Sequence, residues 1–394
     1  MSGYTKVAII SEYNPFHEGH ARLFAEAKRI YPDCAIISVM SGNTVQRGDF
    51  AVYDRFKRAE AATLCGCELV LELPYPFSCS ASEQFATAGV RIAMEAGADV
   101  LFFGSGAEEP SSLFRAASVL GTPEFAEKLR MLVKSEPEVS VLTLRERLYR
   151  EITGEGFPTD GNSSLGIEYI IAAEKLKSEY PDREPIKCHP IKRIGSFTAT
   201  ACREAIRADE TVSERADIPA AAKSVFDGAP VSGGLDAMEQ FVLGALRTLS
   251  FDCNSVRSAN GIREALIKIS LKVGNMAEFN SMLPTGTYTR ARLRRVLMDT
   301  LILPEYADTN GLKNSVPSYT VLLGACGRGF EILSQMRKRS ALTVLTKPSD
   351  TKKLSEEGRA AYTLAERVER LYGLSFRPMR LPAEFIPGFK PNKE

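Results

Sequence analysis

The sequence lacks the features that would place the protein in a membrane or in an oxidising compartment. It has no run of about 18 apolar residues, which is near the shortest length that spans a bilayer as a helix. Residues 1–6 lead directly into an apolar stretch and do not have the form of a signal peptide. The eight cysteines are scattered along 394 residues, so we expect free thiols. We therefore expect a cytoplasmic protein with no membrane contact.

The chain also lacks an excess of charge of either sign. It has 50 Lys and Arg residues against 49 Asp and Glu residues, which gives a formal net charge of +1. No molecule-wide field attracts nucleic acid, so a site for a polyanion must be a local patch. The composition, 44% hydrophobic and 25% charged, is that of a folded globular protein, and the length suggests two or three domains.

Residue types that bind metals are sparse or unsuitably spaced. Cys65 and Cys67 form the only close cysteine pair, but their spacing is wrong for a zinc knuckle and no histidine is nearby. We interpret this pair as packing residues. The chain has only three histidines, and two of them, His17 and His20, belong to one short segment. The third, His189, lies in another segment that carries candidate site residues.

Apolar runs and amphipathic stretches alternate along the first half of the chain. The runs that predict buried strands are residues 6–12, 34–40, 68–73, 99–103 and 186–194. The stretches that predict helices are residues 19–30, 54–64, 82–96 and 200–206, with a charged helical region over 114–149. Strands that alternate with helices predict an α/β fold with a Rossmann-like parallel sheet and right-handed crossovers.

The second half of the chain has a different pattern. Residues 225–298 are mostly helical in pattern. A strand, a helix and a strand then predict a small βαβ-like unit, at residues 319–323, 327–339 and 342–346. We place the domain boundary near residue 210. This gives a catalytic domain over residues 1–209 and a mainly helical C-terminal region over residues 210–394.

The strongest candidate site is the turn N-P-F-H-E-G-H, which lies between the first strand and the first helix. A helix N-terminus presents unpaired N–H groups and a partial positive charge, which suit a phosphate. His17 and His20 share one face of the first helical turn, where two imidazoles can donate hydrogen bonds to phosphates and stabilise a phosphoryl-centred transition state. Gly19 leaves room for close approach of a nucleotide. The turn therefore indicates nucleotide binding and adenylyl transfer.

Two other interpretations of the histidine pair remain open from the residues alone. The two rings can act as capping or packing groups of the helix. They can also contribute to a metal site with the adjacent Glu18, but a catalytic zinc usually has three protein ligands, and no Asp, Cys or further His lies close in sequence. The near absence of histidine elsewhere favours the nucleotide interpretation.

Three weaker segments can complete a phosphate site. Arg193 precedes the small hydroxyl residues of T-A-T-A-C-R, which end at Arg203 and suit a second helix N-terminus. Gly104 follows a strand, and ligands of open parallel sheets lie beyond the carboxyl ends of strands. Asn162 suits a helix N-cap and a ligand contact equally well.

A basic cluster lies in the C-terminal region. Four arginines occur within six residues and follow an aromatic residue, Tyr288: Arg290, Arg292, Arg294 and Arg295. Such a cluster can contact an RNA backbone, or it can be the solvated face of an amphipathic helix.

These motifs together resemble a known family. The H-x-G-H turn resembles that of the nucleotidylyltransferase superfamily. A closer resemblance, to the tRNA-methionine cytidine acetate ligase family, rests on E-Y-N-P-F-H-E-G-H (12–20), M-S-G-N-T-V-Q-R-G-D (40–49), E-L-P (72–74), F-F-G-S (102–105), L-G-I-E-Y (165–169) and T-A-T-A-C-R (198–203). The resemblance covers nearly the whole chain. One departure is Ser163, where the family usually has a second asparagine after the position of Asn162.

The resemblance implies ATP-dependent activation of acetate to acetyl-adenylate, then transfer of the acetyl group to the wobble cytidine of elongator methionine tRNA. It implies that Mg²⁺ accompanies ATP. It also implies ATP contacts at Val7, Ala8, Ile9, Ile10, Ser11, Glu12, Tyr13, Asn14, Pro15, Phe16, His17, Glu18, Gly19, His20, Gly104, Asn162 and Arg193. We expect His17, His20 and Arg203 to be catalytic, and the arginine cluster to bind tRNA.

Two other functions remain alternatives. One is a small-molecule nucleotidylyltransferase that makes a nucleotide cofactor. The other is a non-catalytic, nucleotide-sensing RNA binder. The helical region after residue 210 and the arginine cluster favour the tRNA-modifying enzyme, because an enzyme that makes a cofactor needs neither.

Overall fold

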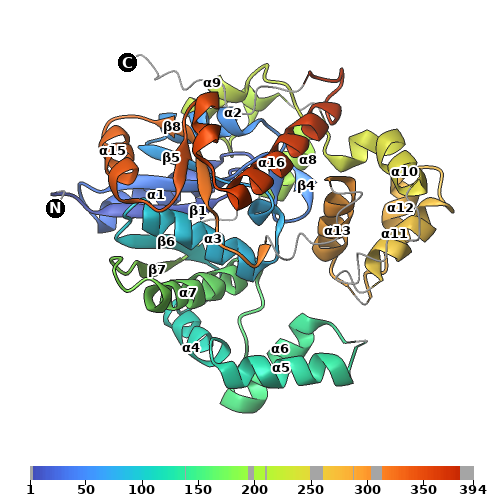
Figure 1. Ribbon diagram of the computed structural model, residues 1–394, viewed down its shortest axis with the longest axis horizontal. Coiled ribbons are helices and arrows are strands. Elements are labelled where there is room, and N and C mark those ends of the chain that lie inside the picture. The colour runs from blue at the N-terminus through green and yellow to red at the C-terminus, as the bar shows by residue number, and fades with distance from the viewer. Residues whose placement is uncertain are drawn as a thin grey trace.

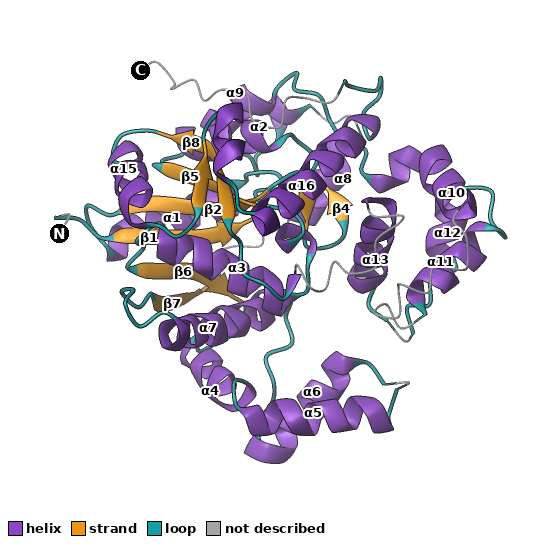
Figure 2. Cartoon of the chain, in the orientation of Figure 1, coloured by secondary structure: helices purple, strands orange, loops and turns teal. Residues whose placement is uncertain are grey.

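The computed structural model describes residues 3–137, 139–193, 199–208, 211–248, 261–286, 288–302 and 313–381. A seven-stranded sheet with the order β7-β6-β1-β2-β5-β8-β9 forms the centre of the molecule (Figures 1 and 2). Five of its strands are mutually parallel: β1 (Lys6–Ser11), β2 (Ala35–Ser41), β5 (Leu69–Leu73), β6 (Val100–Ser105) and β7 (Lys187–Lys192). The predicted Rossmann-like parallel sheet is confirmed.

The last two strands come from the C-terminal part of the chain. They are β8 (Tyr319–Ala325), which pairs antiparallel with β5, and β9 (Thr343–Leu345), which pairs parallel with β8. With α15 (Gly329–Arg339) between them, they form the predicted βαβ-like unit. The unit extends the central sheet beyond β5. The sheet therefore contains strands from both sides of the domain boundary that we expected near residue 210. Residues 209–210, where we expect that boundary, lie outside the described residues.

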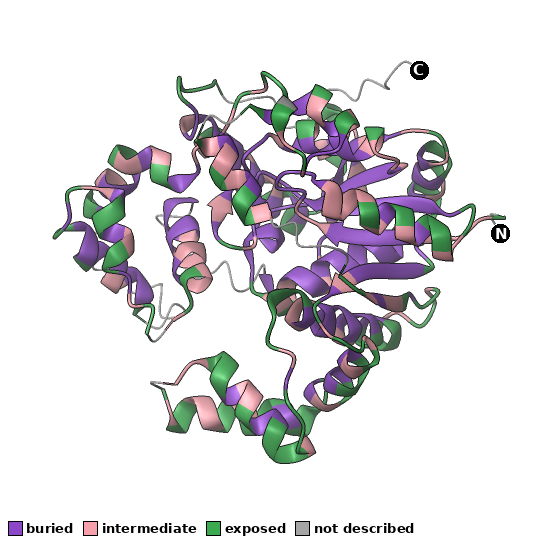
Figure 3. Ribbon diagram, turned by 180° about the vertical axis from the view of Figure 1, so that it is seen from behind, coloured by how far each residue is buried: buried purple, intermediate pink, exposed green. Residues whose placement is uncertain are grey.

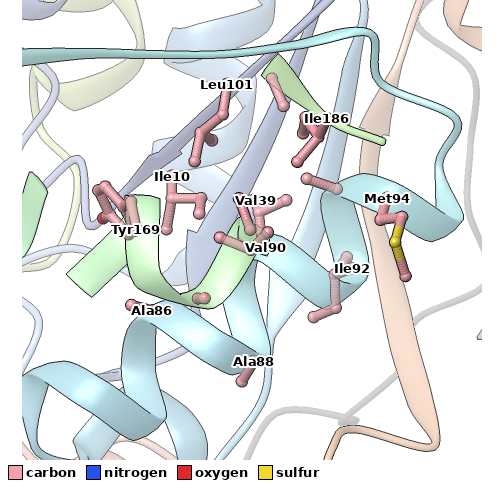
Figure 4. Packing of buried hydrophobic residues seen from close by; sticks show 14 of the residues in the cluster. Ile10, Val39, Ala86, Ala88, Val90, Ile92, Met94, Leu101, Tyr169 and Ile186 are labelled. Atoms are coloured by element: carbon pink, nitrogen blue, oxygen red, sulfur yellow. The ribbon is translucent and has the colours of Figure 1, made fainter. Parts of the chain in front are cut away.

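The central strands are apolar along their length because helices cover both faces of the sheet. Side chains of β1 alternate between two cores: Ala8 and Ile10 face one, and Val7 and Ile9 face the other. Figure 4 shows the first core, where Ile10 lies among residues of the neighbouring helices. The helices that pack on this face are α3 (Ser82–Glu95), α4 (Ser111–Leu120), α7 (Gly161–Glu179) and α15.

Helices on the other face carry the histidine turn and the T-A-T-A-C-R segment. They are α1 (Glu18–Ile30), α2 (Arg55–Leu64), α8 (Ala199–Arg207), α9 (Ala220–Phe226) and α16 (Glu356–Leu374). Asp54 caps α2, because its carboxylate accepts a hydrogen bond from the Phe56 N–H. The predicted loop at residues 195–197 and Thr198 lie outside the described residues.

The charged helical region predicted over residues 114–149 contains three helices. These are α4, α5 (Pro123–Ser135) and α6 (Val141–Thr153), and α5 and α6 project from the sheet (Figure 3). The breaks have local causes: Thr122 caps α5 with Pro123 at its first position, and Ser140 caps α6.

The predicted C-terminal helices form a further core beside the sheet. They are α10 (Glu239–Thr248), α11 (Ile262–Ser270), α12 (Met276–Ser281) and α13 (Arg290–Ile302), and α16 packs against them as well as against the sheet. A short hairpin, β3 (Thr44–Val45) and β4 (Asp49–Phe50), lies between this core and the carboxyl edge of the sheet. No helix in the described part of the chain has both the length and the apolar character needed to cross a membrane.

Candidate active site

A cavity of about 470 Å³ opens at the carboxyl ends of β1, β6 and β7. Its walls come from these strands, the N-terminal turns of α1, α7 and α8, and the β3–β4 turn. A crevice outside the carboxyl ends of the strands is where open α/β sheets bind ligands. Four of the predicted segments contribute residues here: the histidine turn, Gly104, Asn162, and, from the described parts of the stretch 193–203, Arg193, Ala199, Thr200 and Arg203.

His17 and His20 cap α1 and line the cavity at the same time. His17 is the N-cap, and its Nδ1 accepts a hydrogen bond from the Gly19 N–H at 3.0 Å. His20 Nδ1 accepts from the His17 N–H at 3.2 Å, which completes a capping box. The two rings stack with centroids 3.9 Å apart. The histidine pair therefore caps the helix and also lines the cavity, so the capping interpretation does not exclude a ligand-binding role.

Both imidazoles are held in the neutral form. Burial, with the nearby Arg193 cation as the next cause, lowers the pKa of His17 to about 4. Burial lowers the pKa of His20 well below its ordinary value, and His17 and Arg193 lower it further. Because Nδ1 of each ring accepts a hydrogen bond, the ring proton lies on Nε2. The site thus holds two neutral N–H donors that stack without charge repulsion.

The segment from residue 7 to residue 20 divides into cavity residues and core residues. Those that line the cavity are Ile9, Ile10, Ser11, Glu12, His17, Gly19 and His20. The remaining residues do not line it: Val7, Ala8, Tyr13, Asn14, Pro15, Phe16 and Glu18. Tyr13 and Phe16 are fully buried and pack around His20. The four buried residues 13–16 therefore shape the turn and do not form part of the cavity surface.

Two arginines bring positive charge to the α1 side of the cavity. Arg203 on α8 donates hydrogen bonds to the Asn14 carbonyl oxygen at 2.9 Å and to Thr200 Oγ1 at 3.1 Å. Burial lowers the pKa of Arg203, but a guanidinium remains a cation at neutral pH. Arg193 directly follows β7, and its backbone N–H donates to the Ser105 carbonyl oxygen at 2.8 Å. The α1 N-terminus and these cations suit an anionic ligand.

Gly104 and Asn162 form the opposite rim of the cavity. A Cβ atom built on Gly104 would have only Arg193 within 4 Å, so the space beside this glycine is open. Asp160 caps α7 by accepting from the N–H groups of Asn162 and Ser163. Asn162 is exposed and lines the cavity, whereas Ser163 is fully buried. Of these two neighbours, only Asn162 faces the cavity.

Several cavity residues had no role in our sequence interpretation, and two of them, Arg47 and Tyr169, carry polar groups. Arg47 is exposed on the β3–β4 turn and lines the cavity, and Tyr169 lies two helical turns after Asn162 on α7. Both occur in segments that carry the family resemblance, and that was the only signal that could have identified them. Burial raises the pKa of the Tyr169 hydroxyl, so it stays protonated as a donor.

The arginine cluster lies on α13, outside the cavity. Arg294 forms ion pairs with Asp49 at 3.3 Å and with Asp236 at 3.1 Å, and Arg295 donates to the Gln46 carbonyl oxygen at 3.0 Å. Arg290 is exposed, and the half-buried Arg292 guanidinium lies over the Tyr288 ring, 5.1 Å from its centroid. Two of the four arginines, Arg294 and Arg295, therefore hold α13 against the hairpin, while Arg290 is exposed and Arg292 packs beside Tyr288.

The described residues contain no group of three or more His, Cys, Asp or Glu side chains placed to hold a metal ion. Every cysteine among them is a free thiol, including Cys65 and Cys67. The third histidine, His189, donates to or accepts from the Tyr31 hydroxyl at 2.5 Å and does not line the cavity.

Comparison with known proteins gives consistent matches over the whole chain. Residues 4–381 match the model of the HIGH nucleotidyl transferase family. The tRNA(Met) cytidine acetate ligase of Lactobacillus delbrueckii subsp. bulgaricus is 29% identical over 93% of this chain and 94% of its own length. The protein of the same name from Thermosipho melanesiensis is 30% identical over 87% of this chain and 84% of its own length.

The fold is similar to that of a solved relative. TmcAL of Thermotoga maritima, in a crystal structure bound with alpha-thio ATP, superposes with a TM-score of 0.84 and 26% identity. The match covers 96% of this chain and 95% of that one. This chain belongs to the HIGH nucleotidyl transferase family, and within it to the group of the tRNA(Met) cytidine acetate ligases.

Proposed function

We propose that this protein uses ATP to activate acetate as acetyl-adenylate and then transfers the acetyl group to the wobble cytidine of elongator methionine tRNA. The observation that carries the proposal is the single cavity in which the α1 N-terminus, Gly104, Asn162, Arg193 and Arg203 meet. The names of the relatives and the ATP analogue bound to the Thermotoga maritima protein point to the same reaction.

The first step is attack of an acetate oxygen on the α-phosphorus of ATP. A bond forms between acetate oxygen and phosphorus, and the bond to the pyrophosphate oxygen breaks. No covalent enzyme intermediate is needed, so the protein contributes positioning and charge stabilisation. His17 and His20 donate Nε2–H groups to the phosphates, and Arg193 and Arg203 balance the charge that passes to pyrophosphate.

The second step transfers the acetyl group to RNA. The exocyclic amine of cytidine attacks the acetyl carbonyl, AMP leaves, and the amine loses a proton. We assign ATP activation to residues 1–209 and most contacts with tRNA to residues 210–394. Within the second part, the exposed Arg290 and the half-buried Arg292 beside Tyr288 are the proposed contacts with the RNA backbone.

Mg²⁺ enters as part of the ATP substrate in this scheme. Mg²⁺ usually binds through substrate phosphates with one or two protein carboxylates and retained waters. The cavity contains two carboxylates, Glu12 and Asp160. Asp160 caps α7, and Glu12 accepts a hydrogen bond from the Gln46 N–H at 2.9 Å. We assign Glu12, which adjoins the histidine turn, as the group that would accompany the ion; the ion would neutralise phosphate charge.

One incubation tests the proposal. The purified full-length protein is mixed with ATP, Mg²⁺, labelled acetate and total tRNA, and label in tRNA is measured together with AMP. We expect both products, each dependent on ATP. Acetate-dependent AMP without labelled tRNA would remove the RNA step. Transfer of AMP to a small phosphorylated cofactor precursor, with no acetate dependence, would favour the alternative small-molecule nucleotidylyltransferase.

A further inference from the structure

The cavity has a second side whose chemistry differs from that of the phosphate side. Residues of α1 and α8 belong to the core on one face of the sheet, whereas Ile10, Phe103 and Tyr169 belong to the core on the other face. All three also line the cavity, together with Leu165. The cavity therefore spans the carboxyl edge of the sheet, with cations on one side and an apolar wall on the other.

Tyr169 places a single polar atom in this apolar wall. The residue is 3% exposed, and its hydroxyl has no hydrogen-bond partner among the described residues. Its ring is held by an edge contact with Phe103, with centroids 5.3 Å apart, and Figure 4 shows it beside Ile10. The hydroxyl is not among the fully enclosed, unpaired polar atoms of the described residues, and Tyr169 lines the cavity. Its O–H is therefore open to the cavity, where it can donate to an acceptor on a ligand.

The wall around Tyr169 is backed tightly by two helices. A Cβ atom at Gly166 of α7 would lie 2.7 Å from Phe103 Cε2, and a Cβ atom at Gly89 of α3 would lie 2.9 Å from Ile10 Cδ1. Both side chains are thus pressed against helix backbones and cannot retreat to enlarge the cavity. The space beside the hydroxyl therefore suits a short apolar group.

We infer that Tyr169, with Ile10, Phe103 and Leu165, forms the subsite for the carboxylic acid and selects a short-chain acid. This inference rests on the proposed function and names the residues that bind its second substrate. The Tyr169 hydroxyl donates to one carboxylate oxygen, and the alkyl group lies against the apolar wall. A triphosphate belongs instead with the cations on the α1 side, because one neutral donor cannot balance several negative charges.

The geometry fits the bond changes of the first step. The carboxylate oxygen bound by Tyr169 becomes the carbonyl oxygen of the acyl-adenylate, while the other oxygen forms the bond to the α-phosphorus. Pyrophosphate leaves with the electron pair of the broken bond, and no proton moves. Tyr169 therefore acts as a neutral donor in the ground state and in the product, and it binds the acid rather than transferring a proton.

The test removes this hydroxyl alone. Tyr169→Phe is compared with wild type in acetate-dependent ATP–pyrophosphate exchange, with KM measured separately for acetate and for ATP. A lost hydrogen bond to a charged acceptor corresponds to about a tenfold or larger rise in the acetate KM. We expect that rise with an unchanged ATP KM and unchanged binding of a non-hydrolysable ATP analogue.

Tyr53→Phe is the matched control. The Tyr53 hydroxyl is buried without a partner, and Tyr53 does not line the cavity. We expect this variant to keep both KM values. A raised ATP KM in Tyr169→Phe would assign the hydroxyl to the nucleotide and overturn the inference, as would an unchanged acetate KM.

A series of acids tests the wall and separates this inference from the proposed function. In the wild-type protein we expect exchange to fall from acetate to propionate to butyrate. Equal exchange with acetate and butyrate would overturn the short-chain assignment while leaving acid activation intact. Absence of exchange with every acid would reject the proposed function itself, and the acid subsite with it.

Discussion

At the residue scale, His17 and His20 each do two things with two ring nitrogens. Nδ1 of each ring accepts a backbone N–H of the first turn of α1, and this leaves Nε2–H as a donor in the cavity. The cap fixes both the orientation and the tautomer of the rings. Donors that are fixed in advance stabilise charge in a transition state without a reorganisation cost. Structural and chemical roles are therefore inseparable for this pair.

His20→Ala should reduce acetate-dependent ATP–pyrophosphate exchange by about 100-fold or more, because it removes a preorganised donor. The lost capping interaction should cost about 1 kcal/mol of stability, which leaves the protein folded. Exchange kinetics and thermal unfolding check the two effects. His189→Ala is the control, because that histidine pairs with Tyr31 away from the cavity; similar losses in both variants would contradict the assignment.

The depressed pKa of His17 should appear in the pH dependence of stability. The unfolded chain binds a proton near the ordinary pKa of 6.5, whereas the folded protein does so at about 4. Between these values the unfolded state holds more protons, so the free energy of unfolding falls as pH is lowered through this window. Relative to His17→Asn, wild type should lose up to about 3 kcal/mol from pH 7 to pH 4. Parallel curves for the two proteins in denaturant titrations would show that His17 is not buried as described.

At the element scale, the β3–β4 hairpin joins the cavity to the C-terminal helices. Arg47 lines the cavity, and the next residue, Gly48, lies against the backbone of α13. Asp49 then pairs with Arg294 on α13 and with Arg207 on α8, the helix that also carries Arg203. The hairpin is thus in contact with both the proposed ATP site and the helix that carries the proposed tRNA contacts.

Gly48→Ala should destabilise the protein more than an ordinary change at a left-handed glycine. Gly48 has a φ of +74°, and an added Cβ atom would lie 2.4 Å from the backbone of Arg294. Gly154 has a φ of +72° with no atom within 4 Å of the added Cβ, so Gly154→Ala measures the conformational cost alone. We expect about 1 kcal/mol for Gly154→Ala and at least about 2 kcal/mol for Gly48→Ala in denaturant unfolding. Equal costs would mean that α13 does not pack on the hairpin.

The two kinds of arginine on α13 should respond differently to mutation. Arg290→Ala and Arg292→Ala should weaken tRNA binding. Each should also lower the slope of log Kd against log salt concentration by roughly one unit, the amount that one phosphate contact contributes. Arg294→Ala should lower the melting temperature instead, because it removes one ion pair to Asp49 and one to Asp236. Binding titrations at several salt concentrations, with melting curves of each variant, separate the outcomes. If tRNA affinity is unchanged in Arg290→Ala and Arg292→Ala, these two arginines belong to a solvated helix face and do not contact tRNA.

At the scale of the whole molecule, a buried ionic network ties the C-terminal helix α16 to the sheet. Arg55 of α2 pairs with Glu369 of α16 and lies 3.8 Å from Glu72 of β5. All three are almost fully buried. Burial raises the pKa of Glu369 to about 7 in spite of the attraction of Arg55, and the carboxylates of Asp54 and Glu72 raise it further. The network joins α16, near the C-terminal end of the described chain, to α2 and β5 in the N-terminal half, so we expect these elements to unfold together.

Arg55→Met should therefore destabilise the whole protein by about 3–5 kcal/mol, since it leaves the buried Glu369 carboxylate without its ion-pair partner and removes one of the cations near buried Glu72. Arg115→Met is the matched control, because Arg115 pairs with Glu155 at the surface with both side chains 54% exposed. A surface pair of this kind contributes at most about 1 kcal/mol. Unfolding followed by two probes checks both variants. A small loss in Arg55→Met would mean that the network does not bind α16 to the sheet.

Local patterns in the sequence predicted most elements and much of the candidate site. Strands such as β1 and β2 were predictable because burial on both faces requires a continuous apolar run, and α1 because its apolar side chains recur with a helical period. Two long helices, α7 and α16, were not predicted. In α7 the reason is that the sheet and neighbouring helices cover it on several sides, so its apolar residues do not form one stripe.

The sequence by itself determined which turn carries the chemistry, because scarce histidines, a helix start and a preceding strand coincide there. Tertiary structure alone decided which residues share the cavity. Arg47 and Tyr169 come from segments far apart in sequence, and no local pattern measures the distance between them. It also decided that β8 and β9 join the sheet begun by β1, since hydrogen bonding between strands depends on spatial order and not on sequence separation. Position in the fold likewise separates Arg294, which is paired, from Arg290, which is exposed, although both belong to one basic run.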